Sequence, residues 1–299
     1  MLRPFADDGC HRMSSILTPS LPRIPQPWAL KDLPPFRPVA LKLVRLTTNS
    51  NVPIAEVQQV LRTDLAFSAE VLRFANSALI GSRTEVKSVS HAVDFLGLEQ
   101  LKALSMTIAL REFLSTAKTD SLMQQCWKYN LAAASICEWL ARFLWLDREA
   151  CYTAGLVHDI GRLALLRGFP FEYECAVEAI PDRKFDLLQA EKDVFDIDHC
   201  EAGRWLLDQW GFPDDLKDVV SLHHLTPDSK TPPLVAAVYI SWQIADMLGF
   251  SPLATRSADT IKEITVTLPE SARERIFSGL DELPELVSQK ISAAESIHA

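Results

Sequence analysis

Several features that would assign a protein to a class at once are missing from this sequence. Its cysteines are scattered without a Cys-x-x-Cys pair, so a zinc ribbon and a thioredoxin-like motif are absent. Four of them stand in apolar, helix-like contexts, where a free cysteine behaves as a small hydrophobic residue. This usage suits a reducing compartment. The cysteines are Cys10, Cys126, Cys137, Cys151, Cys175 and Cys200.

Long apolar runs are also missing. No uninterrupted run approaches the about 18 residues that a membrane helix requires. The stretch MLRPFADDGCHRM carries Asp7 and Asp8 and has no apolar centre, so it does not match a secretory signal. We therefore expect a soluble, cytoplasmic protein with no membrane partner.

Positive charge is in deficit. The chain holds 30 Lys and Arg against 39 Asp and Glu, which gives a net charge of −9. An acidic balance opposes a general attraction to nucleic acid or to anionic membranes. Since no nucleic-acid recognition motif is present either, we do not expect a nucleic-acid partner.

The sequence has instead a strong helical periodicity. Hydrophobic residues make up 48% of the chain, enough for one large core or two modest ones. The stretch DLAFSAEVLRFANSALIG has Asp64 as an expected N-cap and Gly81 as an expected C-terminal glycine, and a later helical stretch breaks near Gly97. We find no convincing strand alternation and no internal repeat. The sequence predicts an all-α fold with two helical lobes.

Proline content and polar breaks divide the chain into four expected parts. Residues 1–32 are rich in proline, which blocks helices, and we interpret them as a loosely packed arm rather than a partner-binding segment. The polar break STAKTDS separates an N-terminal helical subdomain, 33–118, from a second helical domain, 119–250. The tail, 251–299, ends in an amphipathic helix that either packs on the body or pairs with a second chain as a homodimer.

The stretch GLVHDIGRLAL, Gly155 to Leu165, sets His158 and Asp159 side by side in an apolar run. Burying both is unfavourable unless a partner satisfies them. Further candidates follow at His199, at His223 and His224, and at Asp246 on a later apolar helix. Imidazole and carboxylate together suit iron, manganese or zinc. An aspartate that bridges two metals would suit phosphoester hydrolysis by an activated water.

The order H158-D159, D198-H199, H223-H224 and D246 resembles the HD superfamily of metal-dependent phosphohydrolases. More specifically, the chain resembles HDOD (HD-related output domain) proteins. The likeness runs from about residue 33 to residue 249 and depends on FANSALIG, AVDFLGLEQL, TAGLVHDIGRLAL and DHCEAGRWLLDQWGF. Asn76-Ser77 and AVDFLGLEQL distinguish it from generic HD enzymes.

The resemblance implies an N-terminal helical subdomain packed on an HD-like bundle. It also implies a signalling or regulatory output role, often in attachment to a receiver or sensor domain and mostly without enzymatic activity. Signalling proteins are the expected partners. The same resemblance implies that Asn76 and Ser77 have a structural role.

Two departures from an HD enzyme stand out. In CWKYNLAAA, Tyr129 or Asn130 falls where HD hydrolases carry their first metal-binding histidine, and a neutral phenol is a poor substitute for imidazole. The Gly-Tyr-Pro signature and glutamate of cyclic-di-GMP phosphodiesterases are missing after His224. Two interpretations of the site are therefore equally favoured: a closed hydrogen-bond network around Asp159, and a weak divalent metal site. Each is favoured over a catalytically competent hydrolase site.

Two arginines lie close in sequence to these residues. Arg162 and Arg204 could neutralise the phosphate of a ligand, or they could cover a carboxylate. The sequence therefore supports two functions. The first is a non-enzymatic output module that binds a protein or a small ligand, and the second is a metal-dependent phosphohydrolase.

Overall fold

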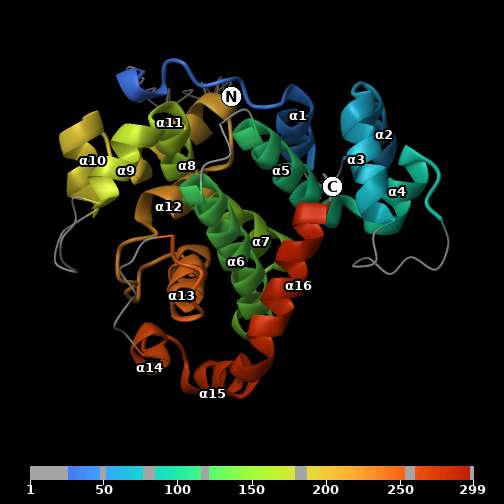
Figure 1. Ribbon diagram of the computed structural model, residues 1–299. Coiled ribbons are helices and arrows are strands. Elements are labelled where there is room, and N and C mark those ends of the chain that lie inside the picture. The colour runs from blue at the N-terminus through green and yellow to red at the C-terminus, as the bar shows by residue number, and fades with distance from the viewer. Residues whose placement is uncertain are drawn as a thin grey trace, which may run out of the picture.

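The structure is a computed structural model that describes residues 26–47, 52–76, 85–115, 121–178, 187–252 and 260–296. In these ranges the regular elements are all helices, which confirms the predicted all-α fold (Figure 1). In chain order they are the 3-10 turn η1 (Trp28–Leu30), α1 (Pro38–Thr47), α2 (Ile54–Arg62), α3 (Leu65–Ala75), α4 (Val89–Leu96), α5 (Leu98–Ser115), α6 (Ser121–Leu144), α7 (Arg148–Val157), α8 (Ile160–Gly168), α9 (Pro170–Glu178), α10 (Leu187–Phe195), α11 (His199–Trp210), α12 (Asp214–Leu222), α13 (Pro233–Met247), α14 (Ile261–Ile264), α15 (Glu270–Gly279), the 3-10 turn η2 (Leu280–Glu282) and α16 (Leu283–Ser296).

Local sequence signals account for several helix ends. The Asp64 carboxylate accepts a hydrogen bond from the Phe67 N–H and caps α3, as predicted. Gly97, with a φ of 76°, separates α4 from α5, and Gly211, with a φ of 67°, closes α11 in the left-handed region. The expected C-terminal glycine Gly81 lies outside the described residues, as does Ser77.

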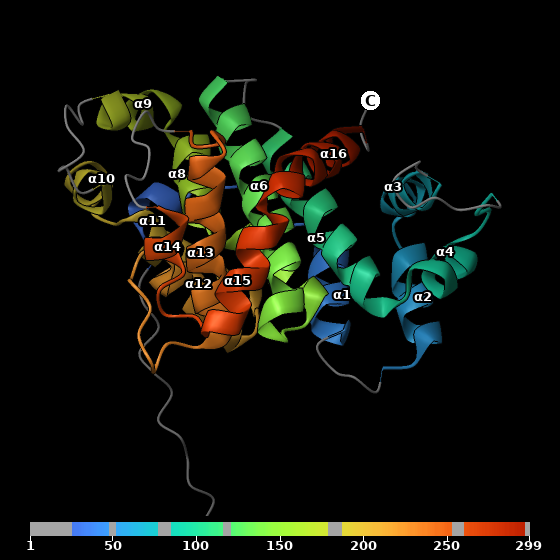
Figure 2. The ribbon, with the colours of Figure 1, turned by 90° about the horizontal axis from the view of Figure 1, so that it is seen from below.

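Helix α6 forms the centre of the molecule. Its residues are buried on nearly every face from Leu122 to Ala141, and it packs against α7, α13 and α16. Helices α2, α3 and α4 lie together at one end, and α5 connects them to the central helices (Figures 1 and 2). Helices α9 and α10 lie at the opposite end.

The two ends of the described chain are both packed on this body. In the predicted arm, Ala29 and Leu30 are buried and the Trp28 ring meets Phe169 edge to face at 5.2 Å. Residues 26–32 are thus part of the fold rather than a loose arm, while residues 1–25 lie outside the described ranges. At the other end, α16 packs on α6, and Arg111 donates a hydrogen bond to the Ala294 carbonyl at 3.0 Å.

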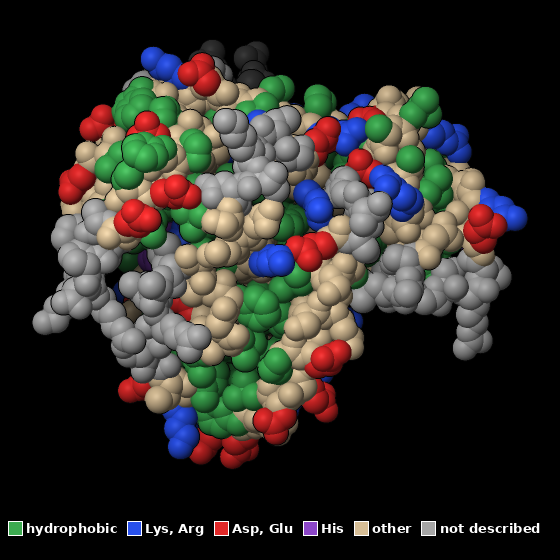
Figure 3. Space-filling model, viewed as in Figure 1, with side chains coloured by type: hydrophobic (Ala, Val, Ile, Leu, Met, Phe, Trp, Pro, Cys, Tyr) green, Lys and Arg blue, Asp and Glu red, His purple; other side chains and the backbone are tan. Residues whose placement is uncertain are grey.

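The molecular surface and the helix lengths bear on the expected partners. On the face seen in Figure 3, basic and acidic side chains are interspersed, and neither sign forms a dominant patch. None of the helices in the described ranges is at once long and apolar enough to cross a membrane.

Candidate functional site

His158 and Asp159 occupy the junction between α7 and α8. The first helix ends at Val157 and the second begins at Ile160, so the pair forms the link between them. Both side chains are buried, with 2% and 1% of their surfaces exposed. The His158 Nδ1 lies 2.7 Å from the Gly155 carbonyl oxygen. A donated Nδ1–H fixes the tautomer and turns the lone pair of Nε2 away from its own helix.

His199 is the first residue of α11, and a buried glutamate holds it there. Asp198 and Glu201 form a capping box that starts the helix. The His199 Nδ1 lies 2.6 Å from the Glu191 Oε2, and the same oxygen accepts the His199 backbone N–H at 2.8 Å. The Tyr173 hydroxyl donates to the other oxygen of Glu191. A wholly buried carboxylate therefore fixes both the ring and the backbone of His199.

These carboxylates also decide the protonation of His199. Burial by itself lowers the pKa of an imidazole. In His199 the negative charges of Glu191 and Asp159 outweigh burial and raise the pKa well above its ordinary value. Glu191 and Asp159 therefore favour the protonated form of His199, and a metal bound at its Nε2 would take the place of that proton.

His223 and His224 follow the end of α12 and face His199. The His224 Nε2 lies 2.9 Å from the His199 Nε2, which fits an imidazolium that donates to a neutral ring. Burial, followed by the positive charge of neighbouring histidines, lowers the pKa of both His223 and His224 well below the ordinary value. The buried Nε2 of His223 has no hydrogen-bond partner within the described ranges.

The four donors of this cluster fit a single divalent metal in kind and in spacing. One ligand atom from each of His199, Cys200, His223 and His224 can be chosen so that all lie within 4.8 Å of one another. Imidazole nitrogen and thiolate sulfur are the ligands that zinc prefers. In such a site Glu191 would orient His199 through Nδ1, as carboxylates commonly do for metal-bound histidines.

Asp159 is engaged by an internal cation. The Arg162 Nε lies 2.9 Å from the Asp159 Oδ2, and Arg162 is itself only 4% exposed. The His199 Nε2 lies 3.4 Å from the other carboxylate oxygen. Burial alone would raise the pKa of Asp159, but Arg162 and the histidines lower it. A bridging role between two metals does not fit this aspartate, because a permanent guanidinium charge lies against it.

Tyr129 and Asn130 belong to the central helix α6 and lie beside His158. The Tyr129 ring lies 5.8 Å from the His158 ring, and burial raises the pKa of this phenol well above 10.0. Tyr129 is thus neutral at the place where the sequence predicts a lost histidine. The Asn130 amide donates to the Leu156 carbonyl at 3.0 Å, which ties α6 to α7.

Asp246 lies on α13 and is a hydrogen-bonding neighbour of Tyr129. It is 6% exposed, and its Oδ1 has no hydrogen-bond partner within the described residues. Burial raises its pKa from 3.8 to about 6, against the opposing effect of hydrogen bonds from Ser251 and Tyr129. Asp246 thus lies near Tyr129, which itself lies beside His158, and the charges of Arg162 and Asp159 act on its carboxyl group.

Asp246→Asn is expected to stabilise the protein at neutral pH. The folded state binds the Asp246 proton more tightly than the unfolded state, so the free energy of unfolding should fall as pH rises from about 4 to 6. The variant should lose this decline and gain about 1–3 kcal/mol at pH 7, because a pKa difference of about two units corresponds to about 3 kcal/mol. Urea unfolding between pH 4 and pH 7 measures it. The exposed Asp281→Asn is the control, and an equal pH profile for all three proteins would contradict the expectation.

Arg204, for which the sequence left a ligand phosphate or a protein carboxylate as the partner, lies on the surface. It is 34% exposed on its side chain and forms ion pairs with Asp208 at 3.7 Å and Asp218 at 3.4 Å. The two arginines are therefore not brought together. Arg162 belongs to the buried cluster and Arg204 to the outer face of α11.

Sequence reasoning missed Glu191, Tyr173 and Cys200. Glu191 and Tyr173 lie in the less regular stretch between residues 170 and 196, where no periodicity marks a site. A charged residue eight positions before His199 gives no signal until α10 folds back against α11. Cys200 directly follows His199, a predicted metal ligand, and this adjacency is the feature of the sequence that could have identified it.

Comparison with known proteins decides the family. The family model of the HDOD domain matches residues 33–226. The chain belongs to the HDOD family. The curated proteins include an uncharacterized protein of Treponema pallidum (strain Nichols) that is 23% identical over 216 residues, which are 70% of this chain and 41% of that protein. The HDOD chain thus spans less than half the length of that relative.

Solved structures share the fold of this HDOD protein. A candidate phosphohydrolase from Shewanella amazonensis SB2B is 24% identical, with a TM-score of 0.70 over 91% of this chain and 99% of that one. An HDOD domain protein of unknown function from Geobacter sulfurreducens is 23% identical, with a TM-score of 0.67 over 87% and 94%. A candidate signal transduction protein from Marinobacter aquaeolei VT8 is 20% identical, with a TM-score of 0.70 over 88% and 60%.

Proposed function

We propose that this HDOD protein is a non-enzymatic signal-transduction output module of the bacterial cytoplasm. It would act by binding a signalling protein or a small ligand, with an upstream receiver or sensor domain as the expected source of its signal. The observation that carries the proposal is the buried ion pair between Asp159 and Arg162.

The physical reason lies in what an HD hydrolase needs from its aspartate. A phosphohydrolase of this kind needs the carboxylate free to hold metal ions that activate a water. Here the carboxylate already faces a guanidinium that cannot lose its proton, and a divalent cation close to Arg162 would be repelled. The neutral Tyr129 beside His158 removes a further ligand.

Turnover measurements test the proposal directly. The full chain, supplied with Fe²⁺, Mn²⁺ or Zn²⁺, is incubated with cyclic dinucleotides, nucleoside phosphates and bis(p-nitrophenyl) phosphate. We expect no hydrolysis beyond that of an Asp159→Asn, His223→Ala double variant, because neither protein can place an activated water. Hydrolysis by the natural sequence that the double variant lacks would contradict the proposal.

A metal-dependent phosphohydrolase is the second candidate function. The donor set of His199, Cys200, His223 and His224 favours it, as does the structural likeness to the candidate phosphohydrolase of Shewanella amazonensis. A single metal at these donors would act without Asp159 as a bridge. Its reaction would then use one metal-activated water rather than a two-metal clamp.

Metal content tests whether Arg162 excludes a second metal ion. We expect at most one equivalent of iron, manganese or zinc in protein purified without chelator, since Arg162 opposes a second ion. His223→Ala should lose the bound metal, whereas the control Asp246→Asn, which changes none of the four donors, should retain it. Elemental analysis measures both. Two equivalents in the natural sequence would show that Arg162 does not exclude a second ion.

A further inference from the structure

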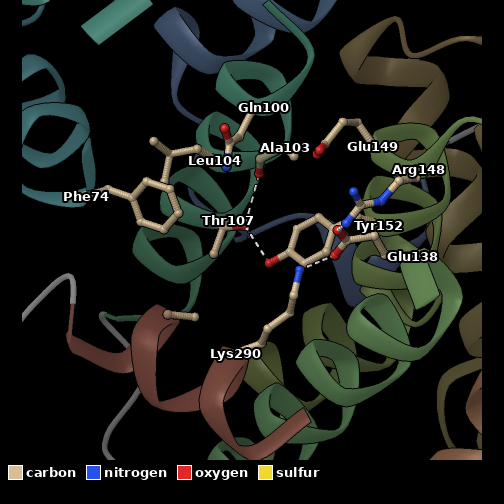
Figure 4. Close-up of a pocket in the computed structure, with 11 residues that line it drawn as sticks. Phe74, Gln100, Ala103, Leu104, Thr107, Glu138, Arg148, Glu149, Tyr152 and Lys290 are labelled. Atoms are coloured by element: carbon tan, nitrogen blue, oxygen red, sulfur yellow. Dashed lines mark hydrogen bonds and ion pairs between the residues drawn. The ribbon is translucent and has the colours of Figure 1, made fainter. Parts of the chain in front are cut away.

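A cavity of about 330 Å³ opens at a junction of three parts of the chain, away from the histidines. Its walls come from α3 and α5 in the N-terminal half, from α6 and α7 in the centre, and from the C-terminal helix α16 (Figure 4). This volume lies within the range of about 300–1,000 Å³ that small-ligand sites occupy. No residue of the candidate metal cluster lines it.

One side of the cavity presents two cations that share a single carboxylate. Glu138 is buried, and its Oε1 lies 2.6 Å from an Arg148 nitrogen while its Oε2 pairs with the Lys290 ammonium. The Lys290 ammonium also lies 5.8 Å from the centre of the Tyr152 ring. Because the group carries one net positive charge and unused N–H donors, it can receive an anion such as a ligand carboxylate.

Glu149 gives the cavity a negative group that can receive a ligand cation. This half-buried carboxylate has no hydrogen bond or ion pair within the described ranges, and Figure 4 shows it directed from α7 toward α5. Burial raises its pKa, followed by the charge of Glu138, so a ligand cation beside it would stabilise its charged form. Gln100 on α5 adds an amide with no partner among the described residues. With Glu149 included, the four charged side chains of the cavity sum to zero.

The rest of the wall is apolar. Phe74 from α3 and Leu104 from α5 stand together at one end, and Ala294 from α16 adds a small surface. Tyr152 lies between this apolar end and the charged end, and its hydroxyl is already engaged with Thr107 at 3.2 Å. The cavity therefore has a charged end, whose side chains sum to zero net charge, and an apolar end beside it.

We propose that this cavity binds a free α-amino acid with an apolar or aromatic side chain, as an input signal of the module. The ammonium would meet Glu149 and Gln100, the carboxylate would meet Arg148 and Lys290, and the side chain would lie toward Phe74. Such a ligand would fasten α3, α5, α7 and α16 to one another and so change how the two halves of the chain are held. The inference adds an input to the proposed output role and rests on it for its biological meaning.

Direct binding to the full chain tests the inference without reference to catalysis. Isothermal titration calorimetry is run with the common L-amino acids and with two analogues of phenylalanine. Phenethylamine lacks the carboxylate of phenylalanine, and 3-phenylpropionate lacks its ammonium. We expect at least one apolar or aromatic amino acid to bind with millimolar or tighter affinity. Each single-charge analogue should bind at least about tenfold more weakly, because a charged hydrogen-bonding group is left unpaired.

Two matched variants assign the binding to the cavity. Glu149→Gln keeps the shape and should weaken amino-acid binding by about tenfold or more. Glu172→Gln is the control. Glu172 lies in the first turn of α9, just as Glu149 lies in the first turn of α7, but Glu172 is exposed and does not line the cavity. Absence of binding across the whole panel, or binding that Glu149→Gln leaves unchanged, would overturn the inference. A hydrolase activity found for the protein would overturn the proposed function and leave this result standing.

Discussion

Gly161→Ala is expected to lower the free energy of unfolding by about 2–4 kcal/mol, because overpacking between rigid backbones cannot relax cheaply. A Cβ at residue 161 would lie 1.9 Å from the His199 carbonyl oxygen and 2.6 Å from the Gly203 nitrogen. Both obstacles are backbone atoms of α11, so α8 and α11 would have to move apart. That movement would pull His199 away from Glu191 and Asp159.

Gly203→Ala provides the matched control for this change. It lies on the facing helix, but the nearest atoms to its Cβ would be 3.4 Å away, at ordinary contact distance. Alanine is the better helix former by up to about 1 kcal/mol, so this variant should be neutral or slightly stabilised. Chemical denaturation of the two variants measures the contrast. Equal stabilities would mean that the close approach of α8 and α11 does not constrain the site.

The features that sequence predicted well are those decided over a few neighbouring residues. Asp64 caps α3 because its side chain reaches an N–H three residues on, and Gly97 separates α4 from α5 because glycine tolerates a positive φ. The pairing of His158 with Asp159 in an apolar run likewise signals burial without any knowledge of the fold. These are local consequences of chain chemistry.

The features that sequence left open depend on helix packing. Arg162 could equally have covered a surface carboxylate or met a phosphate, and the structure buries it against Asp159, three residues earlier on the same turn. Glu191 reaches His199 only because α10 packs against α11. Asp246 was grouped with the histidines from its chemistry, and its hydrogen bond with Tyr129 becomes evident only when α13 packs against α6.

Arg162→Met is expected to destabilise the protein by about 3–5 kcal/mol at pH 7, since it leaves the Asp159 carboxylate buried without its main cation. The control is Arg204→Met, which removes only exposed ion pairs and should cost less than about 1 kcal/mol. Urea unfolding at pH 7 measures both. An Arg162→Met variant as stable as Arg204→Met would mean that His199 alone satisfies Asp159.

A second substitution separates lost charge pairing from lost packing. Adding Asp159→Asn to Arg162→Met removes the stranded charge, so the double variant should recover most of the stability. In the natural protein the pKa of Asp159 is lowered, so its contribution is present above pH 3.8 and is lost as pH falls through the folded-state pKa. In the single variant the carboxylate carries a burial penalty instead, and stability should improve on acidification.

The same variant tests whether Arg162 stands in place of a metal charge. If the guanidinium supplies the positive charge that a metal supplies in an HD hydrolase, its removal should let Mn²⁺ or Zn²⁺ stabilise the folded chain through Asp159. The melting temperature of Arg162→Met should then rise with added metal, while that of the double variant, which also carries Asp159→Asn, should rise less, because stabilisation follows binding to the native state. Equal responses of the single variant and the double variant would mean that Asp159 does not bind metal even without Arg162. Asp159 would then contribute to the fold only through the buried hydrogen-bond and ion-pair network.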